Sequence, residues 1–112
     1  MTLYLTAKTD IDDLTIDFIE VQLKSGKIVS LNWDASWIER CGNTIRAHYE
    51  GVCFDEKSAT GQIDKLKKMR IKEVGMYSDK LGEGQYSLAI ETMEFCDGKK
   101  SLTFHNLYRT ES

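Results

Sequence analysis

IEVQLKSGKIVSLNW, residues 19–33, is the clearest structural signal in this sequence. Apolar side chains occupy every second position before the turn at Gly26, and they do so again after it. Period-two alternation on both sides of a glycine-containing turn predicts an antiparallel β-hairpin with one buried face. Upstream, Ile16 and Phe18 have the opposite apolar parity to Val21, which predicts a bulge or a strong twist in the first strand.

A second hairpin is predicted in LAIETMEFCDGKKSLTFHNL, residues 88–107. Its alternating apolar residues flank Asp97-Gly98, a pair that favours tight hairpin turns because both positions tolerate a positive φ. Residues 45–50 also alternate like a strand, and so does much of RIKEVGMYS, residues 70–78.

One segment between these strands has a different period. Ala59, Ile63 and Leu66 fall at the spacing of one helix face, which predicts an amphipathic helix over residues 58–69. We therefore expect an α+β fold. In this fold, one mainly antiparallel, curled β-sheet of about six to seven strands packs with this single helix.

Length and composition favour a single domain spanning residues 1–112. Hydrophobic residues make up 41% and charged residues 29% of the chain, which is typical of globular proteins. The net charge of -3 does not indicate a surface for nucleic acid or for an anionic membrane. No apolar run approaches the roughly 18 residues of a membrane span, and the first residues do not resemble a secretory signal. The odd number of cysteines, three, favours free thiols in the cytoplasm.

No set of residues predicts catalysis, a metal site or a bound cofactor. Cys41, His48 and Cys53 lie near one another in sequence, but their spacing lacks the tight ligand pair that zinc sites use. No catalytic motif surrounds any cysteine. Gly82-x-Gly84 lacks the further glycine, the lysine and the helix of a phosphate-binding loop. We expect a non-enzymatic protein without a cofactor.

Both tryptophans lie in one short stretch, at Trp33 and Trp37, and two interpretations of it remain open. Ser36 and Glu39 have the spacing of a capping box, so one helical turn is expected to begin at Trp37. In that case Trp33 ends a strand and Trp37 plugs one end of the sheet. The alternative is an aromatic-walled pocket for a small ligand, with Asp34 and Asn32 as polar anchors.

A basic run, Lys65–Lys72, also has two interpretations. It places five positive charges, among them Lys65, Lys68 and Arg70, within eight residues of an otherwise acidic chain. The run fits a solvated helix face whose cations lie near the negative C-terminal end of the helix dipole. It also fits a basic patch for nucleic acid or an acidic protein surface, although no aromatic residues interleave with the lysines as stacking platforms.

Three segments resemble a group of small uncharacterised proteins of Gram-positive gut bacteria: IKEVGMYSD (71–79), MEFCDGKKSLTF (93–104) and IEVQLKSGKIVSLNWD (19–34). The resemblance covers most of the chain and includes no diagnostic motif. It implies a cytoplasmic bacterial protein and no particular activity.

We expect the protein to be an interaction module that binds an unidentified protein or a second copy of itself. Ile16 and Phe18 lie on the face opposite the first hairpin's core, so both faces of that strand need cover, and one short helix covers only one face. The alternative function is a small-ligand or nucleic-acid binder that uses the Trp33/Trp37 corner or the Lys65–Lys72 run. No membrane partner is expected.

Overall fold

A computed structural model describes residues 1–54, 62–84 and 86–105. Their strands form two five-stranded sheets, and the paired strands within each sheet are antiparallel. The first sheet has the order β10 (Lys100–His105), β9 (Thr92–Asp97), β1 (Thr2–Lys8), β5 (Thr44–Glu50) and β4 (Ala35–Cys41). The second has the order β6 (Cys53–Phe54), β3 (Ile28–Asn32), β2 (Thr15–Leu23), β7 (Met69–Tyr77) and β8 (Tyr86–Ser87).

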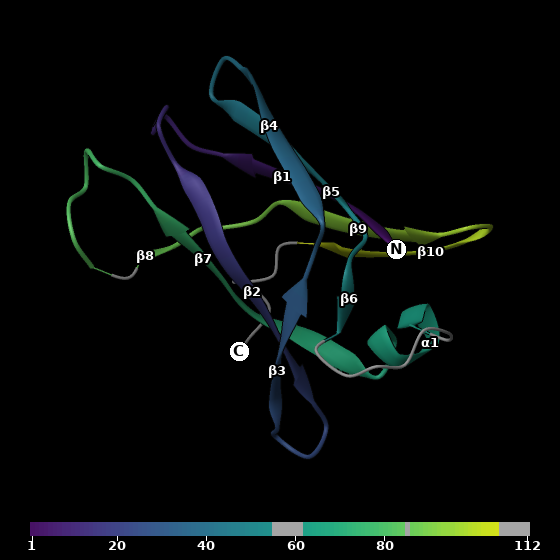
Figure 1. The fold of residues 1–112 in the computed structure, drawn as a ribbon. Coiled ribbons are helices and arrows are strands. Elements are labelled where there is room, and N and C mark those ends of the chain that lie inside the picture. Colours follow the sequence, from purple (N-terminus) through teal and green to yellow (C-terminus); the bar gives the residue numbers. More distant parts are fainter. Residues whose placement is uncertain (55–61, 85, 106–112) are drawn as a thin grey trace.

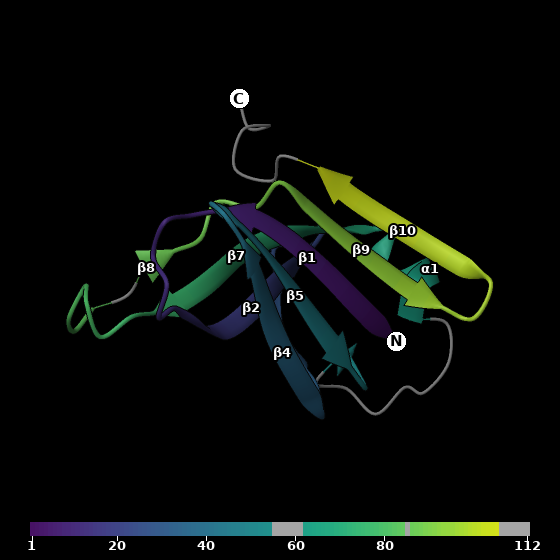
Figure 2. The same cartoon turned by 90° about the horizontal axis from the view of Figure 1, so that it is seen from above.

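The two sheets form the two layers of a twisted sandwich (Figures 1 and 2). The chain passes from one layer to the other four times: between β1 and β2, β3 and β4, β5 and β6, and β8 and β9. Both sheets contribute side chains to one hydrophobic core, whose fully buried members include Leu3, Leu5, Ile45, Met93, Phe95, Ile19, Val21 and Val74.

The prediction of an α+β fold with one curled sheet is wrong, because this is a two-sheet β structure. Alternation specifies one buried face for each strand, and both a curled sheet and a pair of packed sheets satisfy that pattern. Strand pairing, which separates the two cases, depends on contacts that are distant in the sequence.

The predicted helix 58–69 is reduced to the short helix α1, Gln62–Leu66. Residues 58–61 of that prediction lie outside the described residues. Ile63 and Leu66 are buried as the helical spacing predicted. Beyond Leu66 the chain turns and Met69 already begins β7, where pairing with β2 replaces the helical hydrogen bonds.

Both predicted hairpins are confirmed, as β2–β3 and β9–β10. The irregularity predicted in the first strand is also present, because the register of β2 with β7 shifts between Ile16 and Phe18 and again between Glu20 and Val21. Phe18 consequently lies over Gly75 of β7, where a Cβ atom would overlap its aromatic ring.

Candidate functional site

The predicted helical turn at Trp37 is wrong, because Trp37 lies within strand β4. β4 and β5 form a hairpin through a turn at Gly42, whose φ of 63° lies in the left-handed region that glycine adopts easily. The Ser36-x-x-Glu39 spacing therefore does not cap a helix. Pairing with β5 along the whole length of β4 outweighs that local signal.

The structure places the two tryptophans in different environments. Trp33 is half-buried and packs edge-on against the core residue Tyr49, with ring centroids 4.8 Å apart. Trp37 lies on the outer face of the first sheet, with 46% of its surface exposed. Asp34, a polar anchor of the predicted pocket, is exposed between β3 and β4. Its backbone N–H donates to the Glu50 carbonyl oxygen at 2.9 Å. The structure does not bring the two indoles together as walls of one pocket.

An aromatic row crosses the outer face of the first sheet from β1 to β4. The His48 ring lies between Tyr4 and Trp37, with centroid distances of 4.7 and 4.1 Å. His48 Nε2 also contacts Glu50 Oε2 at 2.6 Å. These rings and Glu39, Arg46 and Ala47 line a recess of about 180 Å³.

The sequence does not reveal this row, because the order β1–β5–β4 follows from pairings between strands that are distant in the chain. One signal was present. Tyr4 and His48 occupy the solvent-side positions of their alternating strands.

β4 is an exposed edge strand, and this is the main feature of the candidate site. Among the described strands it pairs with β5 alone, and all seven of its residues are exposed. Ile38, on the inner face, keeps 39% of its surface exposed. Edge strands are commonly protected by charged side chains, proline or a bulge. β4 has no proline, and its register with β5 is regular. Its charged residues are Glu39 and Arg40.

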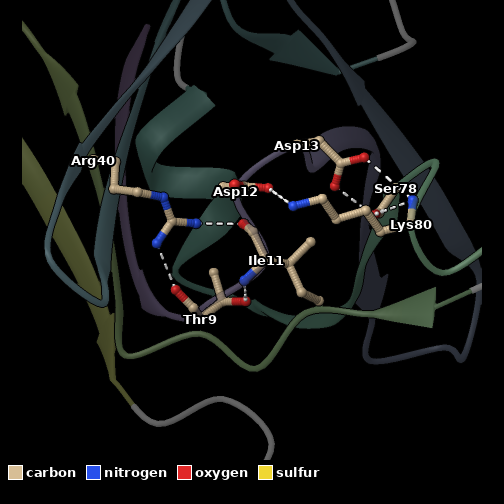
Figure 3. A network of polar contacts seen from close by, with 7 residues as sticks. All are labelled: Thr9, Ile11, Asp12, Asp13, Arg40, Ser78 and Lys80. Atoms are coloured by element: carbon tan, nitrogen blue, oxygen red, sulfur yellow. Dashed lines mark hydrogen bonds and ion pairs between the residues drawn. The ribbon is translucent and has the colours of Figure 1, made fainter.

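Arg40 fastens the C-terminal end of β4 to the loop between β1 and β2 (Figure 3). Its guanidinium donates to three backbone carbonyl oxygens: those of Thr9 at 2.7 Å, Gly42 at 3.1 Å and Ile11. A guanidinium with three fixed acceptors holds its strand in one position. The edge is therefore held in place before any partner binds.

The same loop is tied to the segment after β7. The Lys80 ammonium contacts Asp12 at 2.6 Å, and Ser78 Oγ donates to Asp13 at 2.5 Å (Figure 3). The hydrogen bond from Lys80 lowers the pKa of Asp12, and the hydrogen bond from Ser78 lowers the pKa of Asp13. Both carboxylates are satisfied within the chain, so we interpret this cluster as structural.

The basic run is divided between two elements. Lys65 lies in α1 and is half-buried, whereas Lys68 and Arg70 are exposed and line a groove at the start of β7. The structure therefore brings Lys68 and Arg70 together and leaves Lys65 out of the groove.

All three cysteines are free, at Cys41, Cys53 and Cys96. Within residues 1–54, 62–84 and 86–105, no group of three or more His, Cys, Asp or Glu side chains is arranged to hold a metal ion. No helix in the described part of the chain is long and apolar enough to cross a lipid bilayer.

Comparisons with protein-family models, with curated protein sequences and with solved structures returned no significant match.

Proposed function

We propose that this protein is a non-enzymatic interaction module that binds a second copy of itself through its β4 edge. One observation supports the proposal most strongly: all seven residues of the edge strand β4 are exposed, and the strand displays Trp37 and Ile38. Unpaired backbone N–H and C=O groups on such an edge are a template for another strand. We also propose a cytoplasmic location, which the three free thiols support.

A second copy is favoured as the occupant because β4 is complementary to itself. A two-fold axis through Ile38, the middle residue of β4, pairs the strand antiparallel with its copy along all seven residues. Moving the axis to Glu39 would place two carboxylates opposite each other, and moving it to Trp37 would leave one end of the strand unpaired. The central axis joins unlike side chains: Trp37 with Glu39, Ser36 with Arg40, and Ala35 with Cys41.

This pairing would also cover Trp37 and Ile38, two of the large apolar side chains that the single chain leaves exposed. The two Ile38 side chains meet across the axis on the inner face. On the outer face, each aromatic row of Tyr4, His48 and Trp37 continues into Glu39 of the second copy, whose cross-strand neighbour is Arg46. Two five-stranded sheets would become one continuous ten-stranded sheet.

The small-ligand alternative has weaker support. Ligand pockets usually enclose roughly 300–1,000 Å³. The recess beside Trp37 and His48 is about 180 Å³, and Trp33 does not line it.

Sedimentation equilibrium of the full chain tests self-association through β4. The wild type should change from monomer to dimer as its concentration rises through the micromolar range. Ile38→Lys should stay monomeric, because lysine on an edge strand opposes further pairing. Ile28→Lys is the matched control, because Ile28 of β3 is similarly exposed, at 45% against 39%, and lies outside β4. A monomeric wild type, or an equal loss of dimer in both variants, would overturn the proposal.

A further inference from the structure

A basic groove opens where the turn between β2 and β3 approaches the turn between α1 and β7. Its volume is about 430 Å³. Four cations line it, and two partly buried apolar side chains, Leu23 and Met69, lie among them. The four cations are Lys24, Lys67, Lys68 and Arg70. Only three of them belong to the basic run of the sequence, because the fold brings Lys24 in from the β2–β3 turn.

Among the described residues, little neutralises the positive charge of this groove, and none of their carboxylates lines it. Lys67 has one loose contact, 3.7 Å from Asp64, and both side chains of that pair are more than half exposed. An exposed ion pair of this kind contributes little stability, so Lys67 can exchange its partner for a ligand.

Arg70 is held in position beside the groove. Its Nε and Nη2 donate to Gln22 Oε1 at 3.0 and 2.9 Å. The amide nitrogen of Gln22 donates in turn to the Gly26 carbonyl oxygen at 3.2 Å. These bonds connect β7 to the β2–β3 turn and leave Nη1 of Arg70 without a bond to any described residue. A preorganised guanidinium with a free donor suits a carboxylate or another oxyanion.

The lining favours one class of anion. A nucleic acid offers phosphates to the cations, but its backbone has no apolar group for Leu23 and Met69. No aromatic side chain of the described residues lines the groove to stack on a base. A protein segment can supply carboxylates for the four cations and an apolar side chain that packs against Leu23 and Met69. We propose that this groove binds an acidic protein segment with an embedded apolar residue.

This site is separate from the β4 edge. The groove lies on β2, β7 and the turns beside them, whereas β4 belongs to the other sheet. The Ile38→Lys variant should therefore keep the groove intact, and the two proposals can fail independently.

Fluorescence anisotropy of the full chain tests the groove with a labelled peptide of glutamates around a central leucine. We expect binding that weakens by about tenfold from low to physiological salt. The same peptide with glutamine in place of glutamate should not bind. A peptide with serine in place of leucine should bind more weakly, because it leaves Leu23 and Met69 exposed to water.

Charge reversal locates the binding site. The Lys24→Glu/Lys68→Glu double variant should weaken peptide binding by at least about tenfold, because it removes two cations and introduces two repelling charges. Lys8→Glu, a reversal at the end of β1 outside the groove, should leave binding unchanged. Circular dichroism confirms that each variant folds. No binding of the glutamate–leucine peptide, equal effects of Lys8→Glu and the double variant, or tighter binding of a single- or double-stranded oligonucleotide would overturn the inference.

Discussion

The Trp37 indole and the His48 imidazole lie directly opposite each other across β4 and β5, with ring centroids 4.1 Å apart. One face of Trp37 is therefore covered by its own sheet, while the indole remains 46% exposed at the edge. The proposed pairing of β4 would cover much of the remaining surface. Trp37 is consequently an intrinsic reporter of the proposed association.

Tryptophan fluorescence can follow this burial in a Trp33→Phe variant, which retains Trp37 as its only tryptophan. We expect the emission maximum to shift to shorter wavelength as the protein concentration rises, because pairing removes the indole from water. The Ile38→Lys substitution in the same background should abolish the shift. An emission maximum independent of concentration would contradict pairing at β4.

Gly75 is required where the ring of Phe18 crosses β7, because a Cβ atom at Gly75 would overlap that ring. Gly75→Ala should lower the free energy of unfolding by about 1–3 kcal/mol, the usual cost of overpacking. In a Phe18→Ala background the same substitution should cost much less, because the clash is gone. Urea denaturation of the four proteins in this double-mutant cycle measures the difference. Equal costs in the two backgrounds would show that Phe18 does not constrain Gly75.

Ser78 should contribute to stability in a pH-dependent way. Its hydroxyl is fully buried and donates to Asp13 at 2.5 Å. Ser78→Ala should lower the free energy of unfolding by about 1–2 kcal/mol at neutral pH, because it removes that hydrogen bond. Ser101→Ala, on an exposed residue of β10, is the control and should have little effect.

The pH dependence follows from the direction of the Asp13 shift. The hydrogen bond from Ser78 lowers the pKa of Asp13 in the folded protein. The stabilisation from this hydrogen bond is therefore complete above the ordinary aspartate pKa, and it is lost as the pH falls through the lowered pKa of Asp13. Thermal melts between neutral and acidic pH should show the melting temperatures of the wild type and Ser78→Ala converging at acidic pH. A difference in melting temperature that stays constant with pH would exclude the Asp13 carboxylate as its source.

The Tyr49 hydroxyl is buried and has no hydrogen-bond partner among the described residues. Tyr49→Phe should therefore leave stability unchanged or raise it by up to about 1 kcal/mol, because it removes a polar group that lost its bond to water on folding. Phenylalanine keeps the ring that packs against Trp33. Chemical denaturation gives the value, and a loss above about 1 kcal/mol would mean that the hydroxyl makes a stabilising contact.

Alkaline pH gives a second test at Tyr49. Burial raises the pKa of its phenol above the ordinary tyrosine value. The unfolded chain thus releases this proton at a lower pH than the folded protein, and stability falls as the pH rises above the ordinary tyrosine pKa. Above the ordinary tyrosine pKa, Tyr49→Phe should lose less stability than the wild type as the pH rises. Equal losses of stability in the two proteins would show that Tyr49 does not contribute to the alkaline destabilisation.

The sequence predicted those parts of the fold that depend on neighbouring residues. Alternation on both sides of Gly26 and of Asp97-Gly98 located the two hairpins, and the parity change near Phe18 located the irregular register of β2. These features follow from side-chain direction and turn geometry within about 20 residues.

The predictions that were wrong, the single sheet and the helical turn at Trp37, depend on information that a local sequence pattern lacks. The number of sheets depends on which distant strands pair, such as β1 with both β5 and β9. At Trp37, the capping spacing of Ser36 and Glu39 predicted a helical turn, but pairing with β5 forms a strand instead. The aromatic row and the groove that includes Lys24 were missed for the first reason, because each joins segments that are far apart in the chain.

Site-specific cross-linking tests the proposed dimer most directly, because it reports the strand register. The two-fold axis through Ile38 places Ala35 opposite the native Cys41 of the second copy. Directly opposite residues of antiparallel strands have Cα atoms about 4.5–5.5 Å apart, within the range of a disulfide. Within one chain the same two residues are about 20 Å apart along β4, so they cannot form a disulfide with each other.

The measurement is the mass of oxidised Ala35→Cys protein under non-reducing conditions. The account predicts a covalent dimer that disappears in Ala35→Cys/Cys41→Ser and does not form in the wild type. Thr103→Cys is the matched control and should remain monomeric, because Thr103 is exposed on the edge strand β10 and lies opposite Glu94, with no cysteine across from it. A monomeric Ala35→Cys protein, or a covalent dimer that persists without Cys41, would contradict the pairing of β4 with its copy.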